Sequence, residues 1–122
     1  MGTRAQVKVI QDPTTPDIFL YQHWDGNGLA EKVQRALRLK SGRWDDPTYL
    51  TRIIFREMIR GFEDEFTGYG IGTQIQGDIE YLVTVNIPKQ RIKVEHVRFS
   101  GPNETLMDST FQEFTEAEIP KS

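Results

Sequence analysis

The chain has 122 residues, of which 37% are hydrophobic and 27% are charged, a composition typical of one globular domain. It contains no cysteine, which excludes disulfides, thiol catalysis and cysteine-ligated zinc, and its two histidines are too few for a histidine-rich metal site. The net charge of −3 comes from the C-terminal end, because the first 101 residues hold 14 bases against 13 acids, and we therefore expect no bulk nucleic-acid binding.

The start of the chain predicts two paired strands. Val7 and Val9 alternate with polar residues in "AQVKVIQ" (5–11), which is the period of a half-buried strand. The apolar and aromatic stretch "IFLYQH" (18–23) predicts a second strand. Turn-forming residues separate the two, so we expect them to pair as a hairpin with a long loop.

Two helices are predicted next. Apolar residues recur with helical spacing in "LAEKVQRALRLK" (29–40), and Asn27 stands where an N-cap is expected. The stretch "WDDPTYLTRIIFREMIRGF" (44–62) predicts a second helix, with Asp46 as the N-cap and Pro47 at the first helical position.

The second half of the chain predicts a glycine-rich loop and three strands. Four glycines between positions 68 and 77 indicate a loop that leads into a short strand near "IGTQI" (71–75). The stretches "IEYLVTVNIP" (79–88) and "QRIKVEHVRF" (90–99) alternate as strands do, and their short connection predicts a hairpin.

The order β-β-α-α-β-β-β predicts an α+β fold, an antiparallel sheet with two helices packed on one face. We place residues 1–101 in a single domain and residues 102–122 in an acidic C-terminal tail, which either forms a short helix capped by Asp108 or Ser109 or is only partly ordered. The sequence has no signal-peptide core at its start and no run approaching the roughly 20 apolar residues of a membrane span. We therefore expect a cytoplasmic protein without membrane contact.

The stretch "YQHWDGNG" (21–28) holds the main candidate binding residues, which are Tyr21, His23, Trp24, Asp25 and Asn27. In one interpretation it is only a strand-to-helix joint, with a turn, a cap and two aromatic side chains at the edge of the core. In another, free N–H groups at the helix start hold an anion while the aromatic side chains stack on a ring, which suits a nucleotide-like ligand. The glycine spacing matches neither the P-loop nor the dinucleotide fingerprint.

A third interpretation of this stretch is hydrolytic. His23 would be the base and Asp25 would orient it, because side chains two apart on a strand share a face. No serine stands in a G-x-S-x-G setting that would supply a nucleophile, so we favour a binding protein and expect no catalytic residue and no cofactor. Alignment with a calcium loop puts Lys32 where a bidentate glutamate is required, so we expect no metal.

Two further sets of residues are candidates for contact with a ligand or a partner. Tyr69 lies in the glycine-rich "TGYGIGTQ", although those glycines equally indicate a loop at a sheet edge. Arg52, Arg56 and Arg60 share one helix face, which is solvated unless it meets an acidic partner. The acidic tail of a second copy would be such a partner, and we expect a homo-oligomer.

The candidate stretch resembles one found in small uncharacterised proteins of phages and prophages, which carry a Y-x-H-W-D-G-Y-P-like motif after an early strand. The motif residues present in this chain are Tyr21, His23, Trp24, Asp25 and Gly26. The stretch "IEYLVTV" (79–85) is similar to the family's later "EYxYxV" strand, and the resemblance covers residues 5 to 95. The family's Tyr-Pro is replaced here by Asn27-Gly28, so the turn is rebuilt. The resemblance implies a viral or mobile-element origin and an accessory role, and it identifies no catalytic residues.

We therefore expect a viral or mobile-element accessory protein that acts by binding in the cytoplasm of the host cell. It would either block a host defence protein or sequester a nucleotide-like ligand. The alternatives are a small hydrolase that uses His23 and Asp25, and a virion or assembly component.

Overall fold

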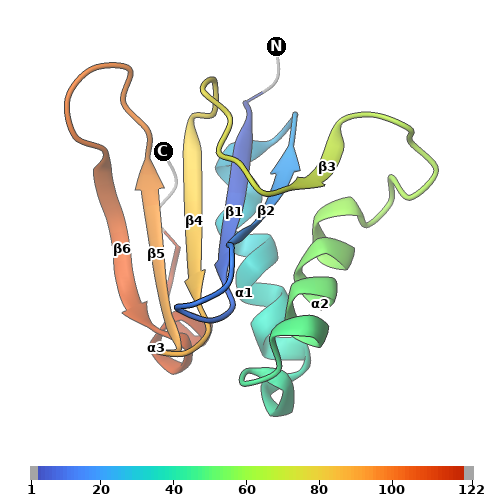
Figure 1. Ribbon diagram of the computed structural model, residues 1–122, viewed down its shortest axis with the longest axis vertical. Helices are drawn as coiled ribbons and strands as arrows, with labels where there is room; N and C mark the ends of the chain where they lie inside the picture. The colour runs from blue at the N-terminus through green and yellow to red at the C-terminus, as the bar shows by residue number, and fades with distance from the viewer. Residues whose placement is uncertain (1–2, 120–122) are drawn as a thin grey trace.

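The chain folds into one six-stranded sheet with three helices packed on one of its faces (Figure 1). The computed structural model describes residues 3–119. The elements, including the short 3-10 turns η1 and η2, are β1 (Ala5–Ile10), β2 (Ile18–Gln22), η1 (Gly26–Gly28), α1 (Leu29–Leu39), η2 (Ser41–Arg43), α2 (Pro47–Ile59), β3 (Tyr69–Gly72), β4 (Tyr81–Asn86), β5 (Arg91–His96), β6 (Glu104–Thr110) and α3 (Phe111–Glu116).

The sheet has the strand order β3-β2-β1-β4-β5-β6. The α+β class and the packing of the two long helices on one face are confirmed. The sheet is mixed and not wholly antiparallel, because β1 and β4 pair in parallel, with Val7 opposite Val83. The chain leaves β2, builds both long helices and β3, and then crosses to the other side of β1, a return that places β4 parallel to β1.

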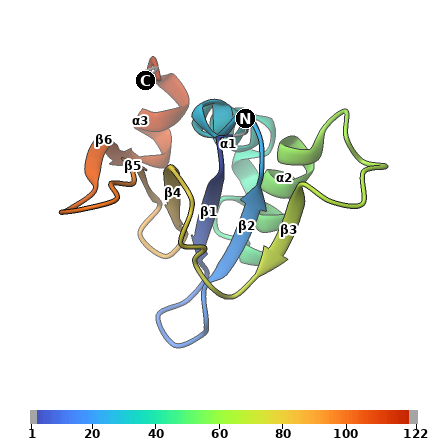
Figure 2. The same ribbon diagram turned by 90° about the horizontal axis from the view of Figure 1, so that it is seen from above.

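The alternation of the strands decides which side chains enter the core. Ala5, Val7 and Val9 are fully buried, as are Val83 and Val85 on the neighbouring strand. These residues meet the apolar stripes of the helices, so the core lies between the sheet and the three helices, as the view from above shows (Figure 2).

The two long helices begin differently. Asp46 is the N-cap of α2 and accepts a hydrogen bond from the Tyr49 backbone N–H at 3.2 Å, with Pro47 at the first turn, as the sequence predicts. The prediction of Asn27 as the N-cap of α1 is wrong. Asn27 lies inside η1, and the cap residue is Gly28, which makes no side-chain cap hydrogen bond.

The segment after residue 101 belongs to the same sheet and core. Residues 104–110 form β6, which pairs antiparallel with β5 along its length, interrupted by one irregularity beside Val94. α3 follows at once, and its Phe111 and Phe114 are fully buried. Its N-cap is Thr110 and neither Asp108 nor Ser109. The structure therefore differs from the division at residue 101, because the acidic segment supplies an edge strand and two core phenylalanines.

Candidate functional site

The turn that follows β2 is held in place by a buried glutamine. The Gln22 side-chain amide donates to the backbone carbonyls of Trp24 at 2.7 Å and Asp25 at 2.9 Å, and its oxygen accepts from Lys32 Nζ at 3.4 Å. Asp25 adopts the left-handed conformation with a φ of 56°. These bonds fix where the Asp25 carboxylate points and explain why a fully buried polar side chain is tolerated at Gln22.

Two glycines allow the chain to pass close to this turn. A Cβ at Gly26 would lie 2.6 Å from the Thr3 carbonyl oxygen, to which the Gly26 N–H donates at 2.8 Å. A Cβ at Gly68, whose φ is 94°, would lie 2.2 Å from the Trp24 ring. Both positions therefore require glycine for structural reasons.

Aromatic rings from three segments gather beside the turn. The Trp24 indole is 44% exposed, and its ring contacts those of His23 at 5.2 Å and Tyr69 at 6.3 Å between centroids. The Tyr69 ring also lies 6.1 Å from that of Phe62. The β2–β3 pairing, with Gln22 opposite Tyr69, brings the glycine-rich loop to the motif, so two separately predicted candidates become neighbours.

His23 does not face Asp25. Its Nδ1 lies 3.1 Å from the Tyr21 hydroxyl oxygen and 3.3 Å from Arg4 Nε, and Arg4 also pairs with Asp78 at 3.1 Å. Because Arg4 can only donate, Nδ1 is the acceptor and the ring proton lies on Nε2. Among residues 3–119, no hydrogen bond or ion pair joins His23 to Asp25, so the geometry gives the hydrolytic pairing no support. Burial raises the pKa of Tyr21, and the Asp78 carboxylate raises it further.

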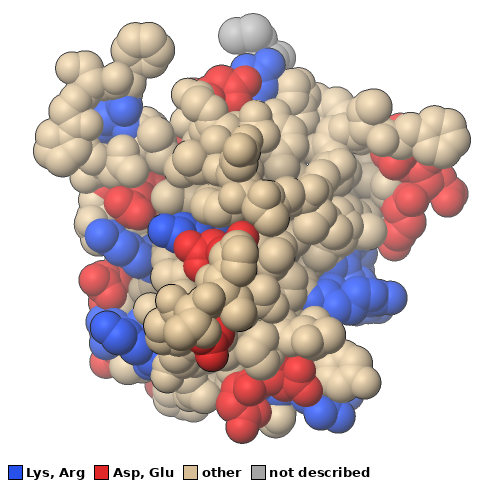
Figure 3. Space-filling view, viewed as in Figure 1, with Lys and Arg blue, Asp and Glu red and all other residues tan. Residues whose placement is uncertain are grey.

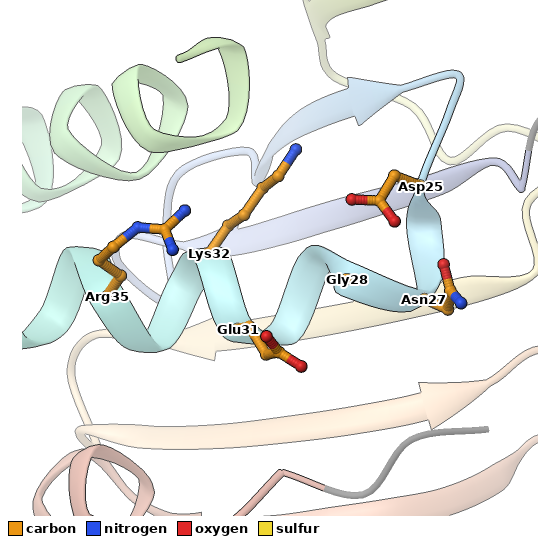
Figure 4. Close-up of a pocket in the computed structure, with 6 residues that line it drawn as sticks. All are labelled: Asp25, Asn27, Gly28, Glu31, Lys32 and Arg35. Atoms are coloured by element: carbon orange, nitrogen blue, oxygen red, sulfur yellow. The ribbon is translucent and has the colours of Figure 1, made fainter. Parts of the chain in front are cut away.

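A hollow of about 280 Å³ lies beside the start of α1. Its lining residues are Asp25, Asn27, Gly28, Glu31, Lys32 and Arg35. In Figure 4 the Lys32 ammonium and the Asp25 carboxylate point toward each other, while Asn27 and Glu31 point away from Lys32. The hollow therefore presents cations and a carboxylate at the same opening.

The ionisable groups near this hollow influence one another. Burial lowers the pKa of Lys32, the Asp25 carboxylate opposes that effect, and the Arg35 charge adds to it. Burial also raises the pKa of Tyr69, and Asp25 raises it further. Asp25 thus acts electrostatically on both the cationic and the aromatic side of the turn.

Three arginines surround one buried carboxylate next to the hollow. Glu57 is 1% exposed, and its oxygens lie 2.8 Å from Arg35 Nε, 3.0 Å from Arg56 Nη1 and 3.6 Å from Arg60 Nη1. The three arginine side chains are about half exposed or more. Three guanidinium groups face one carboxylate, so cationic groups outnumber anionic ones in the cluster. Glu57 holds these groups in place while their outer faces meet solvent.

The predicted arginine row is therefore divided. Arg56 and Arg60 belong to the cluster around Glu57, whereas Arg52 lines a separate hollow with Arg43 and Tyr49. Glu57 already interrupts the apolar stripe of α2 in the sequence, and that interruption is the only local signal of the cluster. The contribution of Arg35 depends on how α1 packs against α2, which no local pattern shows.

Lys32 forms hydrogen bonds on both sides of the hollow. Lys32 Nζ donates to the Gln22 side chain and, at 3.2 Å, to the Met58 carbonyl, which adjoins Glu57 in α2. The Gln22 side-chain amide in turn donates hydrogen bonds to the backbone carbonyls of Trp24 and Asp25. Lys32 therefore links the turn after β2 to the end of α2 through two hydrogen bonds.

Comparison with family models, curated proteins and solved structures gives no match for this chain. Within residues 3–119, no group of three or more histidine, aspartate or glutamate side chains is arranged to hold a metal ion. In the same part of the chain, no helix has the length and apolar character needed to cross a membrane.

Proposed function

We propose that this chain is a binding protein that holds a small nucleotide-like ligand at the hollow between the Trp24 turn and α1. The observation that carries the proposal is the contact of Lys32 with both the Gln22-supported turn and the end of α2. It links the turn that carries Trp24 to the helix end beside the arginines around Glu57. A nucleotide would use both, because its base stacks on rings and its phosphates pair with arginine.

Each part of such a ligand has a partner of suitable chemistry. A phosphate would meet Arg35 and Lys32, which line the hollow. The Asp25 carboxylate would accept a hydrogen bond from a sugar hydroxyl or a base amino group. The partly exposed Trp24 ring, supported by Tyr69, would take the base. The hollow is near the lower end of the roughly 300–1,000 Å³ typical of ligand sites, so a mononucleotide fits better than a larger ligand.

The buried Glu57 favours this use of the arginines. A free arginine loses side-chain freedom when it binds an anion, whereas Arg35 and Arg56 are already held by charge-assisted hydrogen bonds. The cluster keeps an excess of positive charge after Glu57 is counted, which leaves it able to attract a phosphate.

The resemblance to small phage proteins supports a biological role by analogy. In this role the chain is an accessory protein of a virus or mobile element that sequesters a host-made nucleotide in the host-cell cytoplasm. A second candidate role, the blocking of a host protein, is favoured by Phe99, which is 108% exposed in the loop between β5 and β6.

Thermal unfolding of the purified chain with AMP, ADP, cyclic AMP, NAD and inorganic phosphate tests the proposal. A ligand at about 100 times its Kd stabilises the native state by about 2.7 kcal/mol, so the midpoint should rise by several degrees. We expect Trp24→Ala and Arg35→Gln each to remove most of this shift.

Matched variants lie outside the site. Phe99→Ala removes another exposed aromatic ring and Arg52→Gln removes another arginine of α2, and both should keep the shift. The proposal fails if no compound raises the midpoint, or if the site variants and the controls respond alike. A chain that acts by blocking a protein would give no shift with any of these compounds.

A further inference from the structure

A second hollow lies at the first half of α2, away from the proposed ligand site. It has a volume of about 230 Å³ and is lined by Lys40, Arg43, Tyr49, Arg52 and Ile53. The guanidinium carbon of Arg43 stands 4.9 Å from the Tyr49 ring centroid, and Arg43 also pairs with Asp46 at 3.5 Å. Its lining combines the apolar Tyr49 ring and Ile53 with the cationic ends of three long side chains.

The cations of this hollow are only partly neutralised. Asp46 pairs with Arg43, whereas Lys40 and Arg52 form no ion pair with any residue of the described chain, 3–119. Both are exposed. A partner that fits here would place an apolar ring against Tyr49 and Ile53 and carboxylates at the rim.

The loop between α2 and β3 has this chemistry. Phe66 is 99% exposed and follows three consecutive acids, Glu63, Asp64 and Glu65. In Figure 1 the loop projects from the body of the molecule, and the space-filling view shows acidic side chains gathered on it (Figure 3). An exposed aromatic ring beside several carboxylates complements an apolar hollow with a cationic rim.

The loop cannot fill the hollow of its own chain. α2 spans Pro47–Ile59, and 13 residues of helix measure about 20 Å. The hollow lies on the first half of this helix, and the loop starts beyond its last turn and turns away from it (Figure 2). Contact between the two features therefore requires a second molecule.

We propose that the chain associates head to tail, with the 62–66 loop of one copy in the Lys40–Arg52 hollow of the next. Phe66 packs against Tyr49 and Ile53, and the loop carboxylates pair with Lys40 and Arg52 of the other copy. The two contacting surfaces differ, so an open assembly keeps one free loop and one free hollow at its two ends until a ring closes. This inference does not rest on the proposed ligand site, because none of the residues that line that hollow takes part.

Sedimentation velocity of the full chain over a range of concentrations tests the proposal. We expect reversible association of the wild type that weakens as salt is added, because charged rims are screened. Phe66→Ala and the double variant Lys40→Glu/Arg52→Glu should each raise the apparent Kd by about tenfold or more, the loss typical of an interface anchor. Phe99→Ala and Lys89→Glu are the matched controls, and both should associate like the wild type.

Mixing the variants gives the sharpest readout. The Phe66→Ala chain keeps an intact hollow, and the Lys40→Glu/Arg52→Glu chain keeps an intact loop, so an equal mixture should form one-to-one dimers although neither associates strongly alone. Melting curves confirm that each variant is folded, and Glu65→Lys replaces Phe66→Ala if needed. A monomeric wild type, association that the variants leave unchanged, or folded variants that fail to complement would each overturn the proposal.

Discussion

Asp25 shows how a single backbone conformation shapes the candidate site. The left-handed region costs a residue other than glycine roughly 1–2 kcal/mol, and such residues are enriched at functional sites. Here Gln22 secures the conformation through the carbonyls of Trp24 and Asp25, and the Gly26 N–H ties the next residue to Thr3. As a result, the Asp25 carboxylate is directed toward Lys32 and the Trp24 indole stays partly in solvent. A turn that only connects two elements does not need this arrangement.

At the same scale, Gly68 can be tested by substitution. Gly68→Ala places a methyl group against the Trp24 ring at a residue with a φ of 94°, so we expect a loss of about 1–3 kcal/mol in the free energy of unfolding. The indole should also move outward. Urea unfolding gives the free energy, and Trp24 emission in a Trp44→Phe background, which leaves one tryptophan, should shift to the red.

Gly42→Ala is the matched control for this substitution. Its Cβ would meet nothing within 4 Å, and its φ is not positive, so its stability and emission should stay close to those of the parent chain. If Gly68→Ala behaves like Gly42→Ala in both measurements, the close approach of Gly68 to Trp24 does not hold the indole in place.

At the scale of the element, α3 is too short to be stable by itself. A helix of six residues needs tertiary contacts, and α3 obtains them at both ends. Thr110 and Glu113 form a reciprocal capping box at its start. At its end, the Gln34 amide of α1 donates to the Phe114 and Ala117 carbonyls, each at 2.8 Å. α1 therefore supports α3 with hydrogen bonds as well as with apolar contact.

The capping box predicts a pH dependence of stability. The Thr110 backbone N–H, and then its hydroxyl, lower the pKa of Glu113 from the ordinary 4.5. A carboxyl whose folded-state pKa is lowered stabilises the fold fully above its unfolded-state pKa and loses that contribution as the pH falls through the folded-state value. Wild type should therefore exceed Glu113→Gln in stability near pH 6, and the difference should shrink below about pH 4.5.

Urea unfolding of both chains at several pH values measures that difference. Glu116→Gln is the control, since its carboxylate accepts from the Gln112 side chain and not from a backbone N–H of the first turn. A wild-type advantage over Glu113→Gln that stays constant from neutral to acidic pH would contradict the role of the ionised carboxylate.

α3 and the strand before it, β6, show the limit of what the sequence predicts. Local chemistry decides some elements, and the sequence predicts those. The alternation of Val7 and Val9 predicts β1, and the adjacent Asp46 and Pro47 predict the start of α2. The sequence of β6 does not show the regular alternation of a strand. β6 is a half-exposed edge strand, and its pairing with β5 is irregular beside Val94. Without that strand, Phe111 and Phe114 have no visible reason to enter the core.

The candidate site shows a similar limit. The motif residues and Tyr69 can be selected from residue type and neighbouring glycines. Their contact depends on the register of β2 with β3, and the cluster around Glu57 depends on the packing of α1 against α2. Both are long-range features, which local periodicity does not encode.

At the scale of the whole molecule, α1 lies between α2 and α3 and contacts both, so we expect the fold to unfold as a single cooperative unit. The core cluster includes residues from β1 near the start of the chain and Phe114 near its end. We therefore expect residues 102–119 to be required for folding. Phe114→Ala should cost about 3–5 kcal/mol in the free energy of unfolding, the range for a fully buried phenylalanine.

A chain that stops after residue 101 should lose the cooperative unfolding transition, because β5 would lose its outer partner and the core would lose both α3 phenylalanines. Urea unfolding followed by circular dichroism measures both effects, with Phe99→Ala as the exposed control that should change the midpoint little. If the shortened chain unfolds cooperatively with the wild-type midpoint, the first 101 residues are a complete domain. Loss of the transition would instead show that the acidic segment is part of the folding unit, and the Phe114→Ala result then gives the share that one of its core side chains contributes.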